Sequence, residues 1–262
     1  MHDIKILGIQ TDLKWEDVKG NIDAITKKIE LAFDGHDLII LPETFTTGFS
    51  VDPKNFAESI NGITVNWMRD LSQKLNAAIT GSLLISQGTN YTNTLIWMRP
   101  DGTMDTYEKR HLFSMGGEDK EISPGKKPLI VELKGWKIKP MICYDLRFPV
   151  WSKNTYNDGF EYDLAIYIAN WPAVRSYAWK TLLLARAIEN QSYVIGVNRV
   201  GTDGLNIQCN GDSMIIDPMG EIIKETNDGK EEALSVNLSH NNLKKFRSKF
   251  NVGPDWDKFE II

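Results

Sequence analysis

Residues 138–149 read Ile138-Lys139-Pro140-Met141-Ile142-Cys143-Tyr144-Asp145-Leu146-Arg147-Phe148-Pro149. The segment begins with a compact apolar run of strand length, and the thiol of Cys143 follows that run directly. Further along the chain we predict a buried strand at 164–169, a helix at 177–189 and another strand at 194–198. Strands that alternate with helices in this way predict a layered α/β fold, in which helices cover the faces of the sheets.

The same alternation runs through the N-terminal half of the chain. Apolar residues recur at helical spacing over 18–32, which predicts a helix with one buried stripe. No low-complexity linker or change of composition divides the chain, so we predict one domain over residues 1–262. The other predicted elements are strands at 4–9, 38–41, 78–85 and 92–98, a helix at 64–75, a turn at 99–102 that closes a hairpin, and a hairpin formed by 213–217 and 221–224.

The composition argues against several kinds of partner. A net charge of -5 and the lack of a basic run argue against nucleic-acid binding. No run of eighteen apolar residues predicts a membrane span, and the N-terminal residues lack the features of a secretory leader. We therefore expect a cytoplasmic protein without a nucleic-acid or membrane partner.

The two cysteines, Cys143 and Cys209, have no neighbouring ligands at zinc spacing, and no histidine cluster suggests a metal site. In a reducing compartment a free thiol persists and can be used in chemistry. By count alone, two isolated cysteines are more often inert core residues. Whether each cysteine is a reactive thiol or an inert core residue therefore depends on the residues around it.

Three polar residues stand where predicted strands end. Glu43 follows a buried strand, Lys109 lies within residues 107–111 after the strand that follows the 99–102 turn, and Cys143 follows the run described above. Ligand sites in open α/β sheets assemble at the carboxyl ends of strands. A carboxylate, an ammonium and a thiol brought together there can carry out nucleophilic attack. The carboxylate accepts the thiol proton, the thiolate attacks, and the ammonium stabilises the oxyanion. Taken singly, each residue has an ordinary alternative: a solvated Glu, a surface Lys or a core Cys.

The local sequences around these residues favour the catalytic interpretation. In their order and separation they resemble the Glu, Lys and Cys signatures of the nitrilase superfamily of carbon–nitrogen hydrolases. The resemblance covers nearly the whole chain and is closest to the bacterial omega-amidase branch. It is carried by Leu41-Pro42-Glu43-Thr44, Tyr107-Glu108-Lys109-Arg110-His111-Leu112-Phe113, residues 142–149, Ala169-Asn170-Trp171-Pro172, Ala185-Arg186-Ala187-Ile188-Glu189-Asn190-Gln191, Asn198-Arg199-Val200-Gly201 and Gly211-Asp212-Ser213.

The resemblance implies a role for each matching residue. Glu43 is the general base, Lys109 the cation beside the oxyanion and Cys143 the nucleophile, and the backbone N–H of Tyr144 is a second oxyanion donor. Many members have a second glutamate shortly before a Ser-Pro-Gly turn, which is 123–125 here, and this implies Glu118. Glu121 is an alternative, because this loop varies in length. No metal and no organic cofactor is implied.

The state of the thiol follows from opposing effects. Lys109 favours the thiolate of Cys143, whereas burial and an anionic Glu43 oppose it. Because these effects partly cancel, we expect the proton to pass to Glu43 during attack, and no resting ion pair.

The omega-amidase branch acts on monoamides of dicarboxylic acids such as 2-oxoglutaramate, which implies a small-molecule amide substrate. A carboxylate remote from the amide requires a cation or several N–H donors in the pocket. Arg175 is the first candidate and Arg147 the second, with a structural salt bridge as the alternative for both. The predicted aromatic walls of the pocket are Phe45, Phe49, Phe113 and Trp171.

The resemblance also implies a four-layer α-β-β-α sandwich that pairs with a second copy across a helical face. We expect Arg186 and Glu189 to form a buried ion pair that braces the site, and Cys209 to be a bystander. Other possible functions are an N-carbamoyl amino acid hydrolase or aliphatic nitrilase with the same triad, a metal-dependent phosphoesterase and a non-catalytic binding protein. The intact motifs and the lack of histidine–aspartate clusters argue against the last two.

Overall fold

The first strand, β1 (Ile4–Gln10), buries side chains on both of its faces. Ile4 and Ile6 belong to one buried cluster, whereas Leu7 and Ile9 belong to another. This division follows from the strand geometry, because successive side chains point to opposite faces of a sheet. The sheet that contains β1 therefore lies between two cores. The structure is a computed structural model that describes residues 2–261.

Residues 2–261 form two six-stranded sheets and one small hairpin. The first sheet has the order β14-β1-β2-β3-β4-β5, and the second has the order β13-β12-β9-β8-β7-β6. Strands β1, β2 and β3 are parallel to one another, as are β7, β8 and β9. The bounds are β2 (Leu38–Ile40), β3 (Ala78–Gln87), β4 (Asn90–Met98), β5 (Met104–Glu108), β6 (Val131–Leu133), β7 (Trp136–Ile142), β8 (Leu164–Ala169), β9 (Tyr193–Asn198), β10 (Val200–Thr202), β11 (Gln208–Asn210), β12 (Met214–Ile216), β13 (Ile222–Glu225) and β14 (Glu232–Leu238).

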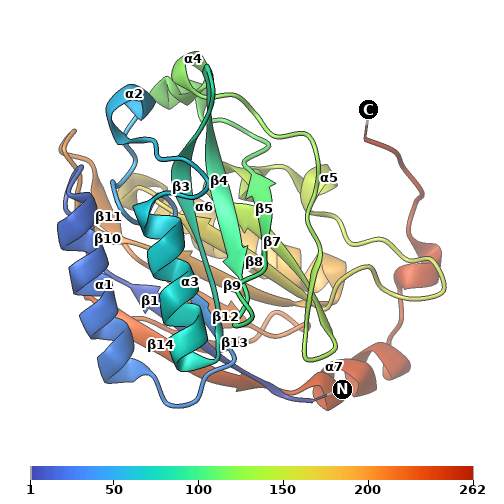
Figure 1. Cartoon of the computed structure of the whole chain (residues 1–262). Helices are drawn as coiled ribbons and strands as arrows, with labels where there is room; N and C mark the ends of the chain where they lie inside the picture. The colour runs from blue at the N-terminus through green and yellow to red at the C-terminus, as the bar shows by residue number, and fades with distance from the viewer. Residues whose placement is uncertain (1, 262) are drawn as a thin grey trace.

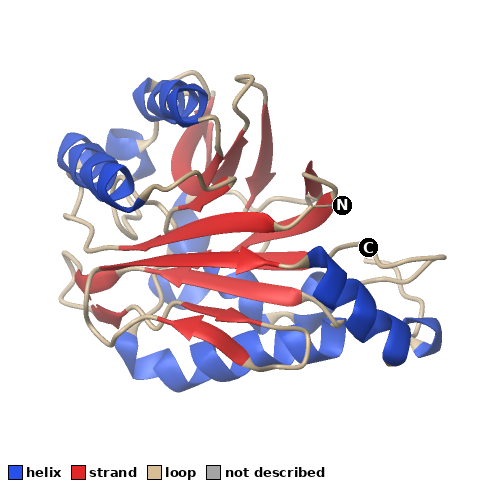
Figure 2. Ribbon diagram, turned by 90° about the horizontal axis from the view of Figure 1, so that it is seen from below, coloured by secondary structure: helices blue, strands red, loops and turns tan. Residues whose placement is uncertain are grey.

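Helices cover the outer faces of both sheets (Figures 1 and 2). One core packs α1 (Val18–Ala32) and α3 (Ile63–Leu75) on the first sheet. The other core fills the space between the sheets and continues to α6 (Ser176–Asn190). The predicted α-β-β-α sandwich in a single domain is thereby confirmed. The remaining helices are α2 (Pro53–Phe56), η1 (Ser114–Gly116), α4 (Glu118–Glu121), η2 (Cys143–Arg147), α5 (Pro149–Ser152), η3 (Ala173–Arg175), α7 (His240–Lys249) and η4 (Gly253–Asp255).

Each strand and helix predicted from the sequence has a counterpart in the structure, with small shifts at the ends. The strands β6, β10, β11 and β14, the helix α7 and the one-turn helices α2, α4 and α5 were not predicted. β14 buries only Leu234 and Leu238, and α7 buries only Leu243. α7 has few apolar residues, whereas Leu234, Val236 and Leu238 alternate along β14, so this strand carries a signal that could have been found in the sequence.

The parallel strands bring their carboxyl ends to one region of the sandwich. β2 runs toward Glu43, β7 runs directly into Cys143, and β8 runs toward Asn170. β5, which ends next to Lys109, follows β4 in an antiparallel hairpin and so points the same way as β3. Segments far apart in sequence thus meet at one site. None of the helices within residues 2–261 has the length and apolar character needed to cross a membrane.

Candidate active site

Cys143 stands at a sharp bend between a strand and a helix. β7 ends at Ile142, and Cys143 is the first residue of the short helix η2. Its φ of 45° lies in the left-handed region, which is strained for a residue with a Cβ atom. The residue is buried but keeps 9% of its surface exposed, and it lines a cavity of about 240 Å³. The bend therefore presents the thiol to a ligand while its neighbours remain in the core.

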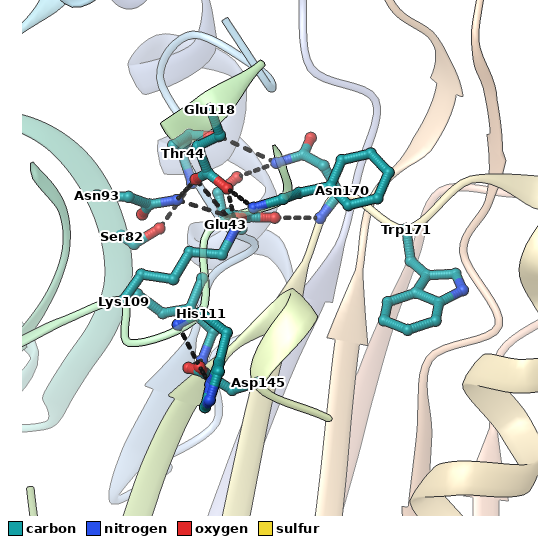
Figure 3. Close-up of polar contacts among 12 residues, drawn as sticks. Glu43, Thr44, Ser82, Asn93, Lys109, His111, Glu118, Asp145, Asn170 and Trp171 are labelled. Atoms are coloured by element: carbon teal, nitrogen blue, oxygen red, sulfur yellow. Dashed lines mark hydrogen bonds and ion pairs between the residues drawn. The ribbon is translucent and has the colours of Figure 1, made fainter. Parts of the chain in front are cut away.

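Glu43 is fully buried and its carboxylate is held by three donors (Figure 3). Its Oε1 accepts hydrogen bonds from Lys109 Nζ at 2.8 Å and from Asn93 Nδ2 at 2.9 Å. Its Oε2 accepts one from the backbone N–H of Asn170 at 2.8 Å. A carboxylate offers about four acceptor positions, so one on Oε2 remains for the thiol of Cys143.

Lys109 connects two glutamates in the interior. Its Nζ lies 2.8 Å from Glu43 Oε1 and 2.9 Å from Glu118 Oε2, and none of its side chain is exposed. Burial by itself lowers the pKa of the Lys109 ammonium, but the charges of Glu118 and Glu43 outweigh it and raise the pKa above its ordinary value. Lys109 is therefore a fixed cation at this position.

Glu118 is the second glutamate that reaches this cluster. It begins the short helix α4, is 1% exposed, and accepts a hydrogen bond from the backbone N–H of Phe113 at 2.7 Å. Asn93 Nδ2, which donates to Glu43, also lies 3.3 Å from Glu118 Oε1. Glu121, the alternative from sequence, is exposed to solvent. The structure therefore brings Glu118, and not Glu121, to Lys109.

The surroundings of Cys143 favour the protonated thiol. Burial and then the charge of Glu43 raise the pKa of Cys143 well above its ordinary value, while Lys109 acts in the opposite direction. A hydrogen bond to Glu43 also contributes to the upward shift. This direction supports the expectation that the thiol gives its proton to Glu43 only during attack.

The raised pKa predicts how the thiol responds to pH. The thiolate is the reactive form, so its population at neutral pH should be smaller than that of an ordinary cysteine, whose pKa is about 8.5. The rate of Cys143 alkylation by iodoacetamide is therefore expected to keep rising above about pH 8.5, where a free thiol levels off. The rate is measured by quenching the reaction at set times and quantifying the alkylated peptide that contains Cys143 by mass spectrometry. A plateau at or below neutral pH would instead indicate a resting ion pair.

The cavity beside Cys143 combines aromatic walls with three arginines, of which Arg199 is paired with Asp12. Arg147 lies over the ring of Trp171, 4.9 Å from its centroid, and Arg175 lies over the ring of Phe113 at 5.3 Å. Within residues 2–261 neither guanidinium forms a salt bridge, so the structural alternative suggested for both arginines is wrong. The full lining is Phe49, Val51, Phe113, Met115, Gly116, Cys143, Tyr144, Arg147, Asn170, Trp171, Pro172, Arg175, Arg199, Asp203, Leu205, Ile207 and Cys209.

Two predictions about the pocket need correction or refinement. Phe45 does not wall it, because its side chain is 0% exposed and packs in the core beneath α3, with its ring centroid 5.8 Å from that of Trp67. Cys209, expected to be a bystander, lies in the wall of the same cavity. Burial raises the pKa of Cys209 to about 11, so its thiol is protonated at neutral pH, and unlike Cys143 it has no hydrogen bond to Glu43 that could take up the proton.

Arg186 braces the nucleophile segment from α6. Its Nη1 lies 2.8 Å from Glu189 Oε1, and its Nη2 donates to the backbone oxygen of Leu146 at 2.7 Å. The arginine side chain is 4% exposed, but that of Glu189 is 37% exposed. The predicted pair is therefore present but is buried only on the arginine side.

Three polar residues of the site were not singled out from the sequence: Asn93, Asn170 and Asp145. Asn170 follows β8 directly, so the strand-end argument that selected Cys143 could also have selected it. Asn93 lies inside β4, and only its packing against Glu43 reveals its role. The described residues contain no group of three or more His, Cys, Asp or Glu side chains arranged to hold a metal ion.

Comparison with known proteins agrees with this geometry. Residues 6–248 match the family model described as carbon-nitrogen hydrolase. The chain is 42% identical over 261 residues to Omega-amidase YafV of Escherichia coli (strain K12), covering 100% of both chains. It is 32% identical over 229 residues to the 2-oxoglutaramate amidase of Bacillus subtilis (strain 168), covering 86% of each.

A solved structure gives the same result for the fold. The crystal structure of XC1258 from Xanthomonas campestris, a CN-hydrolase superfamily protein with an arsenic adduct in its active site, superposes with a TM-score of 0.97. The two chains are 42% identical, and the match covers 100% of each. The resemblance to the nitrilase superfamily is thereby confirmed, and the chain belongs to the carbon-nitrogen hydrolase family.

Proposed function

We propose that this protein is an omega-amidase, which hydrolyses the terminal amide of a dicarboxylic acid monoamide such as 2-oxoglutaramate. The observation that carries the proposal is a buried Glu43–Lys109–Glu118 cluster beside Cys143, which itself lines a cavity with the unpaired arginines Arg147 and Arg175. The cluster supplies the chemistry of amide hydrolysis, and the arginines supply recognition of a remote carboxylate. Relatives named omega-amidase and 2-oxoglutaramate amidase support the same substrate class.

In the first half-reaction, Cys143 Sγ attacks the amide carbonyl while its proton passes to Glu43 Oε2. The negative charge that develops on the carbonyl oxygen is stabilised by the Lys109 ammonium and the backbone N–H of Tyr144. Removal of one such donor costs about 3 kcal/mol of transition-state stabilisation. Glu43 then gives its proton to the leaving nitrogen, so ammonia departs and a thioester remains on Cys143.

In the second half-reaction, Glu43 takes a proton from water, which attacks the thioester and releases the acid. The Cys143 thiolate recovers a proton from Glu43, which closes the cycle. Both carboxylate oxygens of Glu118 accept hydrogen bonds from Lys109 and keep the ammonium in place during both steps. Three donors hydrogen-bond to the Glu43 carboxylate and hold it in one orientation, which lowers the entropic cost of reaching the reactive geometry.

Arg175 is the first candidate for binding the remote carboxylate of the substrate. It is half-buried at the start of α6, and a hydrogen bond from Trp171 Nε1 to its backbone oxygen at 2.8 Å fixes its backbone. Arg147 faces the same cavity from the nucleophile segment. Two guanidinium groups match a substrate whose carboxylate and neighbouring oxo group both accept hydrogen bonds.

Replacing Arg175 with Gln is expected to raise KM for 2-oxoglutaramate by about 10- to 100-fold, because a charged hydrogen bond contributes about 1.5–3 kcal/mol. The value of kcat should change little, since the guanidinium contacts no reacting atom. Steady-state kinetics with a neutral aliphatic amide provide the control, because that substrate has no carboxylate to lose. An equal rise in KM for 2-oxoglutaramate and for the neutral amide would argue against this role for Arg175.

The substrate assignment is tested by comparing ammonia release from three compounds at equal enzyme concentration. We expect the largest kcat/KM with 2-oxoglutaramate, and smaller values with an N-carbamoyl amino acid and with a simple aliphatic nitrile. Activity should survive EDTA and disappear after iodoacetamide. A larger kcat/KM with the N-carbamoyl amino acid would replace the omega-amidase proposal with an N-carbamoyl amino acid hydrolase. Loss of activity in EDTA would favour metal-dependent chemistry.

We propose, further, that the protein forms a homodimer through the outer face of α6. Val174, Tyr177 and Ile188 are 87%, 84% and 54% exposed on this face or next to it, and such a cluster of apolar side chains is typical of an interface. Sedimentation velocity should therefore give a dimer for the native chain and a monomer for Tyr177→Glu. Leu31→Glu is the matched control, because Leu31 is 88% exposed on α1, in the opposite outer layer.

A cytoplasmic location forms part of the same proposal. The mechanism requires a reduced Cys143, and both Cys143 and Cys209 are free thiols in the structure. A reducing compartment maintains that state.

A further inference from the structure

A second buried carboxylate lies directly behind the nucleophile. Asp145 is the third residue of η2, and none of its side chain is exposed. Its Oδ2 accepts hydrogen bonds from the backbone N–H of Ile142 at 3.0 Å and from Tyr107 Oη at 2.6 Å. Its Oδ1 accepts from the backbone N–H of His111 at 3.1 Å and lies 2.8 Å from His111 Nδ1. All four acceptor positions of this carboxylate are therefore occupied.

These four contacts connect two segments that are distant in sequence. Ile142 precedes the nucleophile, whereas Tyr107 and His111 lie two residues before and two residues after Lys109. Figure 3 shows the His111–Asp145 contact below Lys109, while the Lys109 side chain extends upward to Glu43. Asp145 thus joins the chain on both sides of the catalytic lysine to the bend that carries the thiol.

Further packing holds the partners of Asp145 in place. The ring of His111 stacks on Phe148, with 3.7 Å between centroids and 6° between planes. Tyr107 Oη also accepts a hydrogen bond from Trp151 Nε1 at 2.9 Å. Phe148 and Trp151 both follow the nucleophile in sequence, so the contact between the two segments extends beyond the carboxylate itself.

We propose that Asp145 is a positioning residue that sets the distance between the Lys109 ammonium and the Cys143 thiol. This inference rests on the proposed function, because it assumes that these two groups act on one carbonyl. The left-handed backbone of Cys143 is strained and persists only if its surroundings fix it. The hydrogen bond from Ile142 to Asp145 acts at the adjacent residue and provides that restraint.

Replacing one oxygen of the Asp145 carboxylate with an amide nitrogen should break part of this hydrogen-bond network. In Asp145→Asn, the side-chain NH2 must face either the Ile142 and Tyr107 donors or the two His111 donors, so at least one side loses its acceptor. The two segments should then separate slightly. Misplacement of a reacting group by about 1 Å costs about 100-fold in rate.

We expect Asp145→Asn to lower kcat by about 100-fold while KM stays within about twofold, because no substrate contact is removed. Asp163→Asn is the matched control. Asp163 is also buried and accepts from the backbone N–H of Lys137 and from Arg247, but it stands before β8, at the end opposite Asn170. Asp163→Asn should lower Tm about as much as Asp145→Asn does, but should leave kcat unchanged. If Asp145→Asn fails to fold, Tyr107→Phe serves instead: it removes one donor to Asp145, together with the acceptor of Trp151 Nε1, and should lower kcat by about tenfold.

A purely structural role makes a different prediction. If Asp145→Asn keeps kcat within about threefold of the native value below its Tm, the positioning role is overturned. A rise in KM with unchanged kcat would overturn it as well. Failure of the proposed function is recognised separately, since Cys143→Ala would then retain activity, or 2-oxoglutaramate would not be the preferred substrate. Asp145 is tested with whichever amide the enzyme hydrolyses fastest.

Discussion

Replacing Cys143 with Ala is expected to lower kcat by about 10⁴-fold or more, the largest effect of any single change. Cys209, the other described thiol in the cavity, cannot replace the lost thiol, because Cys209 forms no hydrogen bond with Glu43, the group that takes the proton from Cys143. The fold should persist, because the alanine can adopt the same bend between β7 and η2 and removes only one sulfur atom. Ammonia release measures the loss, and circular dichroism verifies the fold. Cys143→Ser should be nearly as inactive, because a hydroxyl is a much weaker nucleophile than a thiol in this setting.

The control for this experiment is Cys209→Ala. Cys209 lines the same cavity but makes no contact with the Glu43–Lys109 cluster in the structure, so its removal should leave kcat within a few-fold of the native value. Mass spectrometry of native enzyme quenched during turnover should find an acyl adduct on the peptide that contains Cys143. Substantial activity in Cys143→Ala, or an adduct on Cys209, would refute the mechanism.

The positions of the catalytic groups could be predicted because each depends on a short local signal. A compact apolar run followed by a polar residue identifies a strand end, and parallel strands bring such ends together. Glu43 and Cys143 both follow this rule, and the structure places their strands in different sheets that face one another. The sequence alone could not show that these two sheets meet, because periodicity carries no information on which sheets pack together.

The residues that hold the catalytic groups were harder to predict. Asn93 lies in the middle of β4, where an isolated amide has no local signature, and its role arises from contacts with Glu43 and Glu118. Asp145 lies two positions after the nucleophile, but its partners Tyr107 and His111 are more than 30 residues away in sequence. Such roles depend on tertiary packing, which a one-dimensional pattern does not record.

The error at Phe45 has a related cause. Aromatic residues near a catalytic motif either line a pocket or fill the core, and the core is the more common place for them. Gly81 on β3 decides the outcome here. A Cβ atom at this position would lie 2.8 Å from Phe45 Cδ1, so the ring packs against the glycine and occupies the space of a missing side chain. The sequence contains that glycine but not its proximity to Phe45.

Replacing Lys109 with Gln is expected to reduce both activity and stability. The change removes the ammonium that stabilises the oxyanion, which should lower kcat by about 10²- to 10³-fold. It also leaves Glu43 and Glu118 buried without their counter-charge, and breaking such a buried pair costs about 3–5 kcal/mol. Steady-state kinetics and urea denaturation measure the two effects separately.

The double variant Lys109→Gln/Glu118→Gln distinguishes the two roles of the lysine. It removes one positive and one negative charge, so the net charge of the cluster returns to its native value. Part of the lost free energy of unfolding should therefore be recovered, because only Glu43 remains charged in the buried cluster. Activity should not be recovered, since no cation faces the developing oxyanion. If activity returned together with stability, the ammonium would act only by balancing the glutamate charges, and its catalytic role would have to be abandoned.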